Sequence, residues 1–521
     1  MERTSSIRYA APPVGPRRFR EPQVPAVNRT APQRAWSDPA ACPQSAPQLS
    51  NASFLAPLLP TGAASEDCLY LNVFAPKNAH NLPVFVWIHG GGYELGAAST
   101  YDPSPLIHTN NGSFIAVVIQ YRLGAFGFLS GDEVKHKGAL NSGLLDQQLT
   151  LHWVQKYIKL FGGDPKRVTI AGESAGAGSV MNHAIAYGGS QGSHLWTNAI
   201  TASPYIWQYL GYDSPEVLDT YNSFAALAGC GERGGETFEC LQSAASSNLT
   251  AANEQIASSS LLGAFVWRPV IDGEFIQQRP TDALQGRING QRVLTGNNAN
   301  DGLIFVPQNI TTQGRFVDYL RLYFPRLDDD AIASILDVYH TPNIPDSPST
   351  PKFQTAGDSG PTAVNQSELT TGHQQVANNF NAEVSFICPS YWLASSFEKN
   401  GGAAYQYQFS VTPALHAFDV LHYFPSSFFP ADPDVAATFQ RAYGGFVTTN
   451  RPSSWPQTKV ESPLMENLNA TGGQPVDFNG FTIFVDPGVE PDFRSVDADT
   501  WEGKRAERCD FLRSLSDVLL I

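Results

Sequence analysis

Gly172-Glu173-Ser174-Ala175-Gly176 is the pentapeptide around which the sequence is organised. It follows the apolar run of residues 168–171 and precedes a helix-like stretch of residues 177–186, which is the order of strand, sharp turn and helix that a nucleophile elbow requires. The turn strains the backbone of its central residue, and the flanking glycines let the strand and the helix approach closely. Ser174 is therefore expected to be exposed at the end of a strand, although ordinary glycine-rich turns also match so short a pattern.

The composition is that of a globular protein with a large core. The chain has 521 residues, of which 42% are hydrophobic and 16% are charged, and this balance argues against disorder. The net charge of −15 offers no basic surface for nucleic acid and would repel anionic substrates, so neutral substrates are favoured. No apolar run approaches the roughly 18 residues of a membrane span.

The cysteines and the glycosylation sequons favour an oxidising, extracellular route. Six cysteines allow about 15 complete pairings, and the residue pattern alone does not choose among them: Cys42, Cys68, Cys230, Cys240, Cys388 and Cys509. The Asn-x-Ser/Thr sequons begin at Asn28, Asn51, Asn111, Asn248, Asn309, Asn365 and Asn469. No C-x-x-C or His-rich spacing indicates a metal site. Residues 1–4 lack the apolar core of a secretory signal, so we expect a secreted protein whose signal peptide is absent from this chain, either because it was removed or because the reading frame is truncated.

Alternating strands and helices predict an α/β fold with a large, mostly parallel sheet flanked by helices. Strands are expected at residues 69–74, 84–88, 114–121, 168–171, 293–296 and 405–410, and helices at residues 141–160, 177–186 and 500–519. The proline-rich residues 1–65 are expected to be surface loops. Residues 346–366, rich in Pro, Ser, Thr and Gly, are interpreted as a long loop rather than a domain linker.

A triple-glycine loop supplies the second part of a hydrolytic site. His89-Gly90-Gly91-Gly92 follows the apolar strand of residues 84–88. Without side chains, backbone N–H groups can crowd around a developing negative oxygen. The expected oxyanion donors are Gly91, Gly92 and Ala175, which comes directly after the nucleophile. Losing one such donor typically costs about 3 kcal/mol of transition-state stabilisation.

Further segments bring the chain close to one family. The sequence resembles the type-B carboxylesterase/lipase family, which includes fungal lipases and cholinesterases, within the α/β-hydrolase fold. The matching segments are residues 9–15 (YAAPPVG), 65–73 (SEDCLYLNV), 89–93 (HGGGY), 121–129 (YRLGAFGFL), 141–147 and 161–179. The resemblance covers most of the chain and is densest between residues 65 and 180.

The resemblance also indicates a base and an acid. The family carries its base in a His-x-x-acid segment after the nucleophile, and residues 416–419 (HAFD) match it, so His416 is the expected base and His422 is the alternative. This fold orders its triad as serine, acid, histidine. Residues 296–302 (GNNANDG) place Asp301 where the family usually has glutamate. Since aspartate is one methylene shorter, the backbone must come closer to the imidazole, and the same residues would also suit a simple turn.

Other site features follow from the resemblance alone. Glu173 and Asp419 match acidic positions beside the family's site, where they would stabilise the imidazolium or hold loops as buried polar groups. The implied disulfides are Cys42 with Cys68, Cys230 with Cys240, and Cys388 with Cys509. The last pair favours one domain over residues 1–521. The family's N-terminal hairpin is expected to be missing, because only residues 1–6 precede the first matching segment.

The expected activity is hydrolysis of carboxylic esters through an acyl-enzyme formed on Ser174, with no metal or organic cofactor. A small, neutral and fairly hydrophobic ester is the expected substrate; a triacylglycerol lipase is the alternative, and a non-catalytic adhesion protein a more distant one. In the resembled lipases the loop matching residues 43–67 acts as a flap. Here it carries the apolar residues 54–59 (FLAPLL), which could cover an acyl site, contact lipid or pack down. Its only aromatic residue is Phe54, and since cholinesterases use a tryptophan there, choline esters are disfavoured.

Overall fold

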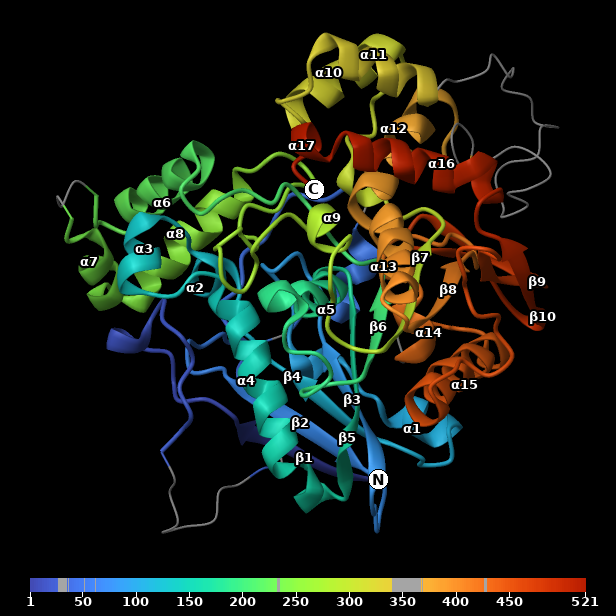
Figure 1. Cartoon of the computed structure of the whole chain (residues 1–521), viewed down its shortest axis with the longest axis horizontal. Coiled ribbons are helices and arrows are strands. Elements are labelled where there is room, and N and C mark those ends of the chain that lie inside the picture. The colour runs from blue at the N-terminus through green and yellow to red at the C-terminus, as the bar shows by residue number, and fades with distance from the viewer. Residues whose placement is uncertain are drawn as a thin grey trace.

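A ten-stranded sheet runs through the computed structural model, in which strands from both ends of the chain take part (Figure 1). The structure describes residues 1–26, 35, 37–50, 52–60, 62–231, 235–339, 367, 369–425 and 429–521. The strands are β1 (Glu2–Arg8), β2 (Tyr70–Ala75), β3 (Leu82–Ile88), β4 (Ile115–Ile119), β5 (Gly163–Glu173), β6 (Asn198–Ala202), β7 (Arg292–Asn298), β8 (Ala403–Phe409), β9 (Leu464–Phe478) and β10 (Phe481–Asp497). Their order in the sheet is β1-β2-β4-β3-β5-β6-β7-β8-β9-β10.

The centre of the sheet is parallel, as predicted from the alternating pattern. Neighbouring strands from β4 to β9 all pair in parallel, whereas β1, β2 and β10 are antiparallel to their neighbours. The central strands are buried on both faces, which explains their continuous apolar runs. Every residue of β4 is buried, as are residues 168–173 of β5.

Helices pack along this sheet and beyond its carboxyl edge. They are α1 (Ser104–Thr109), α2 (Gly124–Phe128), α3 (Asp132–Lys137), α4 (Ser142–Tyr157), α5 (Ala175–Ile185), α6 (Pro215–Leu227), α7 (Thr237–Ser243), α8 (Ser246–Ser258), α9 (Pro280–Ala283), α10 (Gln313–Tyr323), α11 (Asp329–Val338), α12 (Gly372–Ala382), α13 (Cys388–Lys399), α14 (Val420–Tyr423), α15 (Pro433–Thr449), α16 (Trp501–Ser514) and α17 (Ser516–Leu519). In Figure 1, α4, α5 and α13 lie in front of the sheet, and α5 packs on β5 while α13 packs on β7 and β8. Helices α1 and α15 pack on each other, and α15 also contacts β3.

Several expected elements differ from those observed. Residues 1–65 are not all loop, because β1 pairs antiparallel with β2 and forms the edge of the sheet. The single closing helix expected over residues 500–519 is two helices, α16 and α17, and positive φ angles at Glu502, Gly503 and Lys504 interrupt the first of them. The loop interpreted at residues 346–366 lies outside the described residues. No helix of the described segments is long and apolar enough to cross a bilayer.

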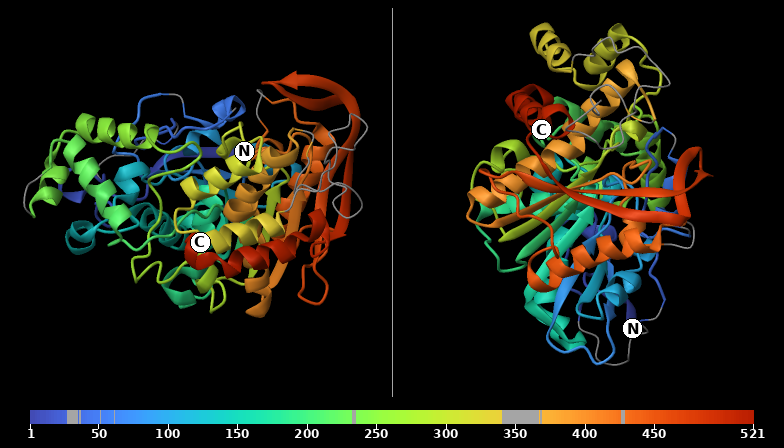
Figure 2. Two further views of the ribbon diagram at one scale, coloured as in Figure 1. Left: turned by 90° about the horizontal axis from the view of Figure 1, so that it is seen from above. Right: turned by 90° about the vertical axis from the view of Figure 1, so that its right-hand side faces the viewer.

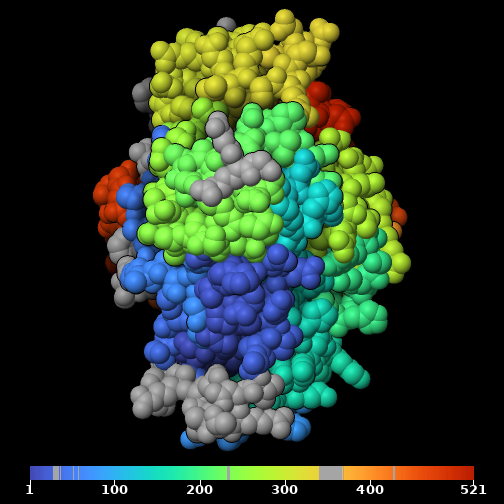
Figure 3. Space-filling view, turned by 90° about the vertical axis from the view of Figure 1, so that its left-hand side faces the viewer, coloured from blue at the N-terminus to red at the C-terminus, as the bar shows by residue number. Residues whose placement is uncertain are grey.

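Strands β9 and β10 form a long antiparallel ribbon at one end of the sheet (Figure 2). The sequence pattern did not predict either strand, because both expose much of their length and carry glycine and proline. The short β6 was missed as well. The N-terminal segment is better anchored than a loop prediction implies: Arg18 donates to the backbone oxygens of Gln242 and Ala244, and the dark-blue surface lies against the green helical segment in Figure 3.

The C-terminal helix α16 is tied to the centre of the molecule by charge and by a disulfide. Arg508 donates to Glu383 at 2.7 Å, and Arg505 donates to the same carboxylate at 3.1 Å. The two guanidinium groups and Tyr339 outweigh the cost of burial and lower the pKa of Glu383 to about 2. The structure also pairs Cys388 with Cys509.

All six cysteines are paired. Besides Cys388–Cys509, the disulfides are Cys42–Cys68 and Cys230–Cys240, which are the three pairs that the family resemblance implies. Sequence separations of 26, 10 and 121 residues divide them into two local links and one long-range link.

Removing the long-range disulfide is expected to destabilise the protein most. The chain-entropy relation gives about 5 kcal/mol for Cys388–Cys509 and about 3 kcal/mol for Cys230–Cys240. The double variants Cys388→Ser/Cys509→Ser and Cys230→Ser/Cys240→Ser provide matched tests, compared by urea unfolding and by thermal inactivation half-life. Equal losses in the two variants would contradict the prediction that the tie to α16 matters more.

Candidate active site

Ser174, Asp301, His416 and the glycine loop all lie beyond the carboxyl ends of central parallel strands. Ser174 follows β5, Asp301 follows β7 and His416 follows β8. The glycine loop follows β3, which pairs directly with β5. Open α/β sheets bind ligands at this edge, and here it gathers groups from segments more than 200 residues apart in sequence.

Ser174 occupies a strained turn between β5 and α5. Its backbone angles are φ 55° and ψ −125°, a region that non-glycine residues seldom adopt. Hydrogen bonds hold the turn: the Ser174 N–H donates to Ala202 O at 2.9 Å, and the Tyr205 N–H donates to Ser174 O at 3.1 Å. The glycines are sterically required, since a Cβ on Gly172 would lie 2.4 Å from the Gly176 carbonyl carbon. This geometry is that of the predicted nucleophile elbow.

The predicted oxyanion donors are available around the same point. Gly91 and Gly92 have φ angles of 105° and 62°, which favour glycine. The N–H groups of Gly91, Gly92 and Ala175 have no hydrogen-bond acceptor among the described residues. At Gly90 the loop approaches Ser174 so closely that a Cβ on Gly90 would lie 3.0 Å from the Ser174 Cβ.

Asp301 and His416 form a direct pair. The imidazole Nδ1 lies 2.8 Å from Asp301 Oδ1, and both side chains are buried, with 0% and 4% of their surfaces exposed. Asp301 therefore reaches the imidazole despite being shorter than glutamate. An acid at Nδ1 holds the proton there, which leaves Nε2 free to act as a base.

Two residues that the sequence reasoning missed hold Asp301 in place. The Ser203 hydroxyl lies 3.0 and 2.9 Å from the two carboxylate oxygens, and the Asn298 N–H donates to Oδ2 at 2.9 Å. Ser203 follows β6, a strand that was not predicted. Asn298 ends β7 and was considered only as a spacer between Gly296 and Asp301.

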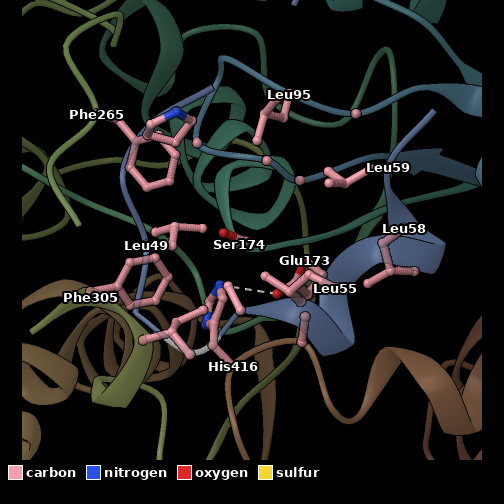
Figure 4. A pocket seen from close by; sticks show the side chains of 18 of the residues that line it. Leu49, Leu55, Leu58, Leu59, Leu95, Glu173, Ser174, Phe265, Phe305 and His416 are labelled. Carbon is pink, nitrogen blue, oxygen red and sulfur yellow. Dashed lines mark ion pairs between the residues drawn. The ribbon is translucent and has the colours of Figure 1, made fainter. Parts of the chain in front are cut away.

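Glu173 lies against the other side of the imidazole. Its Oε1 is 3.2 Å from His416 Nε2 (Figure 4), but neither atom has an aligned hydrogen bond with any described residue. Burial, with the charges of Asp419 and Asp301, raises the pKa of Glu173 well above its usual range. These surroundings favour the neutral carboxyl group over the carboxylate.

Asp419 contacts the site through Asn298. Its carboxylate accepts hydrogen bonds from Asn298 Nδ2 at 3.1 Å and from the Tyr407 hydroxyl at 2.9 Å. Burial raises the pKa of Asp419 to about 6, although the hydrogen bond from Asn298 opposes the shift. Asp419 thus fixes the residue that in turn supports Asp301.

The other histidines considered from the sequence have structural surroundings. His422, the alternative base, approaches the Phe418 carbonyl through Nδ1 at 3.2 Å, and its ring packs against Phe409 and Phe429. Burial lowers the pKa of His422 to about 4. His89 stacks on Tyr121, and burial likewise lowers its pKa to about 4. Neither side chain lines the cavity at Ser174.

A mainly apolar cavity of about 300 Å³ opens in front of Ser174 and His416 (Figure 4). Its aliphatic and aromatic lining comes from irregular segments and short helical turns: Leu49, Leu55, Leu58, Leu59, Leu95, Phe265, Ile304 and Phe305. Phe386 and Phe305 also flank the imidazole, with ring centroids 4.3 and 5.0 Å from that of His416. Phe386 lies in a π-helical turn, Glu383–Ile387, a feature often found at functional sites.

The expected flap borders this cavity. Within residues 43–67, a 3₁₀ turn (Ser53–Leu58) turns Leu55 and Leu58 toward the cavity. Phe54 points instead into the core, with 1% of its surface exposed, and packs on Phe418 and Phe481. Leu59 lines the cavity but stays 39% exposed. Within the apolar residues 54–59, Phe54 therefore anchors the turn in the core, whereas Leu55, Leu58 and Leu59 line the cavity.

Comparison with known proteins gives a consistent result. A family model described as "Carboxylesterase family" matches residues 5–475. Carboxylesterase patB of Aspergillus clavatus is 33% identical over 509 residues, covering 88% of this chain and 85% of that protein. Secreted lipase 1 of Botryotinia fuckeliana is 32% identical, covering 91% and 87%. Secreted triacylglycerol lipase LIP1 of Gibberella zeae is 35% identical, but the match covers only 64% of this chain and 61% of that lipase.

Solved structures show the same fold. The crystal structure of Aspergillus niger EstA superposes with a TM-score of 0.76 and 24% identity, covering 100% of this chain and 95% of EstA. A PNB esterase gives a TM-score of 0.72 and 25% identity, covering 97% and 95% of the two chains. The predicted α/β-hydrolase fold is confirmed.

Asp301→Asn is expected to lower kcat on a p-nitrophenyl ester by about 10³- to 10⁴-fold, because an amide facing Nδ1 favours the wrong imidazole tautomer. Asp318→Asn, an exposed position on α10, is the matched control and should leave kcat unchanged. Undiminished kcat in folded Asp301→Asn would exclude Asp301 as the orienting acid.

Proposed function

The chain belongs to the carboxylesterase family and hydrolyses carboxylic esters, and we propose that Ser174, His416 and Asp301 perform this reaction on neutral, fairly hydrophobic substrates. The observation that carries the proposal is the 2.8 Å contact between Asp301 and His416 at the cavity that Ser174 also lines. The positive φ at Ser174 supports its role as the nucleophile.

In the proposed mechanism, His416 Nε2 takes the proton of the Ser174 hydroxyl as its oxygen attacks the ester carbonyl. The N–H groups of Gly91, Gly92 and Ala175 receive the negative charge that develops on the carbonyl oxygen. The protonated imidazole then gives its proton to the leaving alcohol. Water repeats the sequence on the acyl-enzyme and releases the acid.

Glu173 and Asp419 are proposed to act on the imidazole and its support rather than on the substrate. Because burial and the neighbouring carboxyl groups favour its neutral form, Glu173 can donate a hydrogen bond toward Nε2 between turnovers without fixing a charge beside it. During the reaction the Ser174 hydroxyl must replace Glu173 as the partner of Nε2. Such a change is consistent with the observation that catalytic hydrogen bonds often tighten only when substrate binds. Asp419 supports the acid through Asn298.

The cavity supports an esterase for substrates of moderate size. Its lining is mainly apolar, and no Lys or Arg side chain of the described residues lines it, so an uncharged acyl or alkyl group matches it better than an anion. A triacylglycerol lipase is the second candidate, favoured by the partly exposed Leu59 on the flap and by relatives named lipases. In that case the flap leucines would contact lipid at an interface.

We also propose that the chain is one extracellular catalytic domain. One sheet that includes strands from β1 to β10 supports a single domain. Three disulfides, together with relatives named as secreted lipases, support secretion. Asn111, Asn248 and Asn309 are exposed and Asn469 is partly exposed, so these four could accept glycans. Asn28, Asn51 and Asn365 lie outside the described residues.

Ser174→Ala is expected to reduce p-nitrophenyl ester turnover by at least about 10⁴-fold while leaving the far-UV circular dichroism spectrum unchanged, because the acyl-enzyme can no longer form. A serine-directed organophosphonate should label the wild-type protein at Ser174 and leave Ser174→Ala unlabelled. Turnover that persists in the variant, or labelling at another serine, would refute the proposed nucleophile.

Acyl-chain length provides the test of substrate class. Each added methylene that the cavity buries is expected to raise kcat/KM by up to about fourfold, from about 0.8 kcal/mol per CH₂, until the cavity is filled. A series of p-nitrophenyl esters from acetate to palmitate measures this, and tributyrin assayed below and above its solubility limit tests the interface. A sharp rise in rate only above that limit would favour the lipase instead.

A further inference from the structure

Glu94 is a buried carboxyl group that the proposed mechanism does not use. It follows Gly91-Gly92-Tyr93 in the chain and has 0% of its surface exposed. Carboxyl groups are almost never fully buried without a charged partner, and none of the ion pairs between described residues includes Glu94. Its burial two residues after an oxyanion donor therefore needs an explanation.

Hydrogen bonds of Glu94 join three segments around the site. Its N–H donates to Gly91 O at 2.9 Å, which closes the turn of the oxyanion loop, and its carbonyl accepts from the Ser45 N–H at 3.0 Å, at the base of the flap. The side-chain Oε1 accepts from the N–H groups of Val266 and Trp267 at 2.8 and 2.9 Å. Oε2 has no partner within the described part of the chain.

The segment that Glu94 holds carries one wall of the cavity. Phe265, directly before Val266, lines the cavity. Its ring packs so closely on the oxyanion loop that a Cβ on Gly92 would lie 2.0 Å from it. Any movement of residues 265–267 would therefore move the surface against which Gly92 rests.

We propose that Glu94 is a positioning residue for ester hydrolysis, which holds the Gly91–Gly92 loop against the Phe265 wall through its two side-chain hydrogen bonds. The inference rests on the proposed roles of Gly91 and Gly92. In this role the Glu94 side chain fixes the position of two parts of the site relative to each other. One is the set of N–H groups that receive the oxyanion, and the other is the surface that contacts the substrate.

The protonation state of Glu94 makes this role sensitive to pH. Burial raises the pKa of Glu94 to about 8, against the lowering effect of the Trp267 and Val266 N–H groups and of Arg268. The other ionisable groups that face it are Glu254, which raises its pKa, and Tyr205. Below about pH 8 the carboxyl is thus neutral, with a proton for the unpartnered Oε2. Above that pH it places a negative charge near the developing oxyanion, which opposes the reaction.

The raised pKa of Glu94 makes the stability of the folded protein depend on pH. The folded-state pKa lies above the ordinary value of 4.5, so between about pH 4.5 and 8 the folded protein binds more protons at this group than the unfolded chain does. Stability attributable to Glu94 therefore falls as pH rises through this window, and the loss is complete above about pH 8.

The experiment compares wild type, Glu94→Gln and Glu94→Ala in the full chain, with Asp328→Asn as the control. Asp328 is exposed and its Oδ1 accepts a hydrogen bond from the Ala331 N–H at 2.8 Å, so it matches Glu94 as a carboxyl group bonded to backbone but lies outside the site. The measurements are kcat and KM on p-nitrophenyl butyrate from pH 6 to 10, and Tm from pH 5 to 9. Ser174→Ala is assayed in parallel, so that a failure of the proposed nucleophile is recognised separately, and Tm does not depend on activity at all.

Glu94→Ala is expected to lower kcat by about tenfold to a hundredfold, more than it changes KM, because it releases the loop. Glu94→Gln keeps the Oε1 acceptor and should recover most of this loss at pH 7. It should also lack the wild-type fall in kcat above pH 8, and its Tm should gain on that of wild type as pH rises from 5 to 8. A wild-type kcat in Glu94→Ala, or pH profiles of activity and Tm in Glu94→Gln that match those of wild type and Asp328→Asn, would overturn the proposal.

Discussion

Close approach of three backbone segments at Ser174 is the constraint on which the site depends. A Cβ on Gly176 would lie 2.1 Å from Ile88 O, and one on Gly90 would lie 2.7 Å from Glu173 O. Helix α5, the end of β3 and the end of β5 therefore approach one another at glycines, where any Cβ would clash with backbone. This contact places the proposed oxyanion loop beside Ser174, the proposed nucleophile, and no side chain could be accommodated without separating the two. The strained φ of Ser174 is maintained because the surrounding strands determine where the chain must turn.

The hydrogen bonds that each receives distinguish the two carboxyl groups in contact with the imidazole, those of Asp301 and Glu173. Asp301 accepts from Ser203, from the Asn298 backbone and from His416, so its negative charge is compensated where the mechanism requires it. Glu173 is equally buried, but its Oε1 has no aligned donor in the described part of the structure, and desolvation favours its neutral form. Carboxyl groups of the same chemistry thus take different roles because a dry site stabilises a charge only where donors have been provided.

Much of the fold and of the candidate site could be predicted because the relevant information is local. The elbow, the glycine loop and the apolar parallel strands each lie within a few consecutive residues whose backbone requirements are strict. Strands β9 and β10 could not be predicted in this way, because their exposed residues show no continuous apolar pattern and their pairing compensates for glycine and proline in the ribbon. Ser203 was missed for a related reason: its role exists only through contact with Asp301, 98 residues later in the chain.

The residues that line the cavity come from different parts of the chain from the proposed catalytic residues. Leu55 and Leu58 reach the cavity from a turn held by Phe54, whose ring packs on Phe418 and Phe481. Phe265 and Phe305 reach it from segments outside the sheet. None of these residues takes part in the hydrogen bonds among Asp301, His416 and their supports. Substitutions in the cavity wall can therefore change which ester fits while leaving the reacting groups in place. Phe265 and Phe305 are exceptions. The ring of Phe265 rests on Gly92 and that of Phe305 packs on the His416 imidazole, so a change at either would alter the cavity and the reacting groups together.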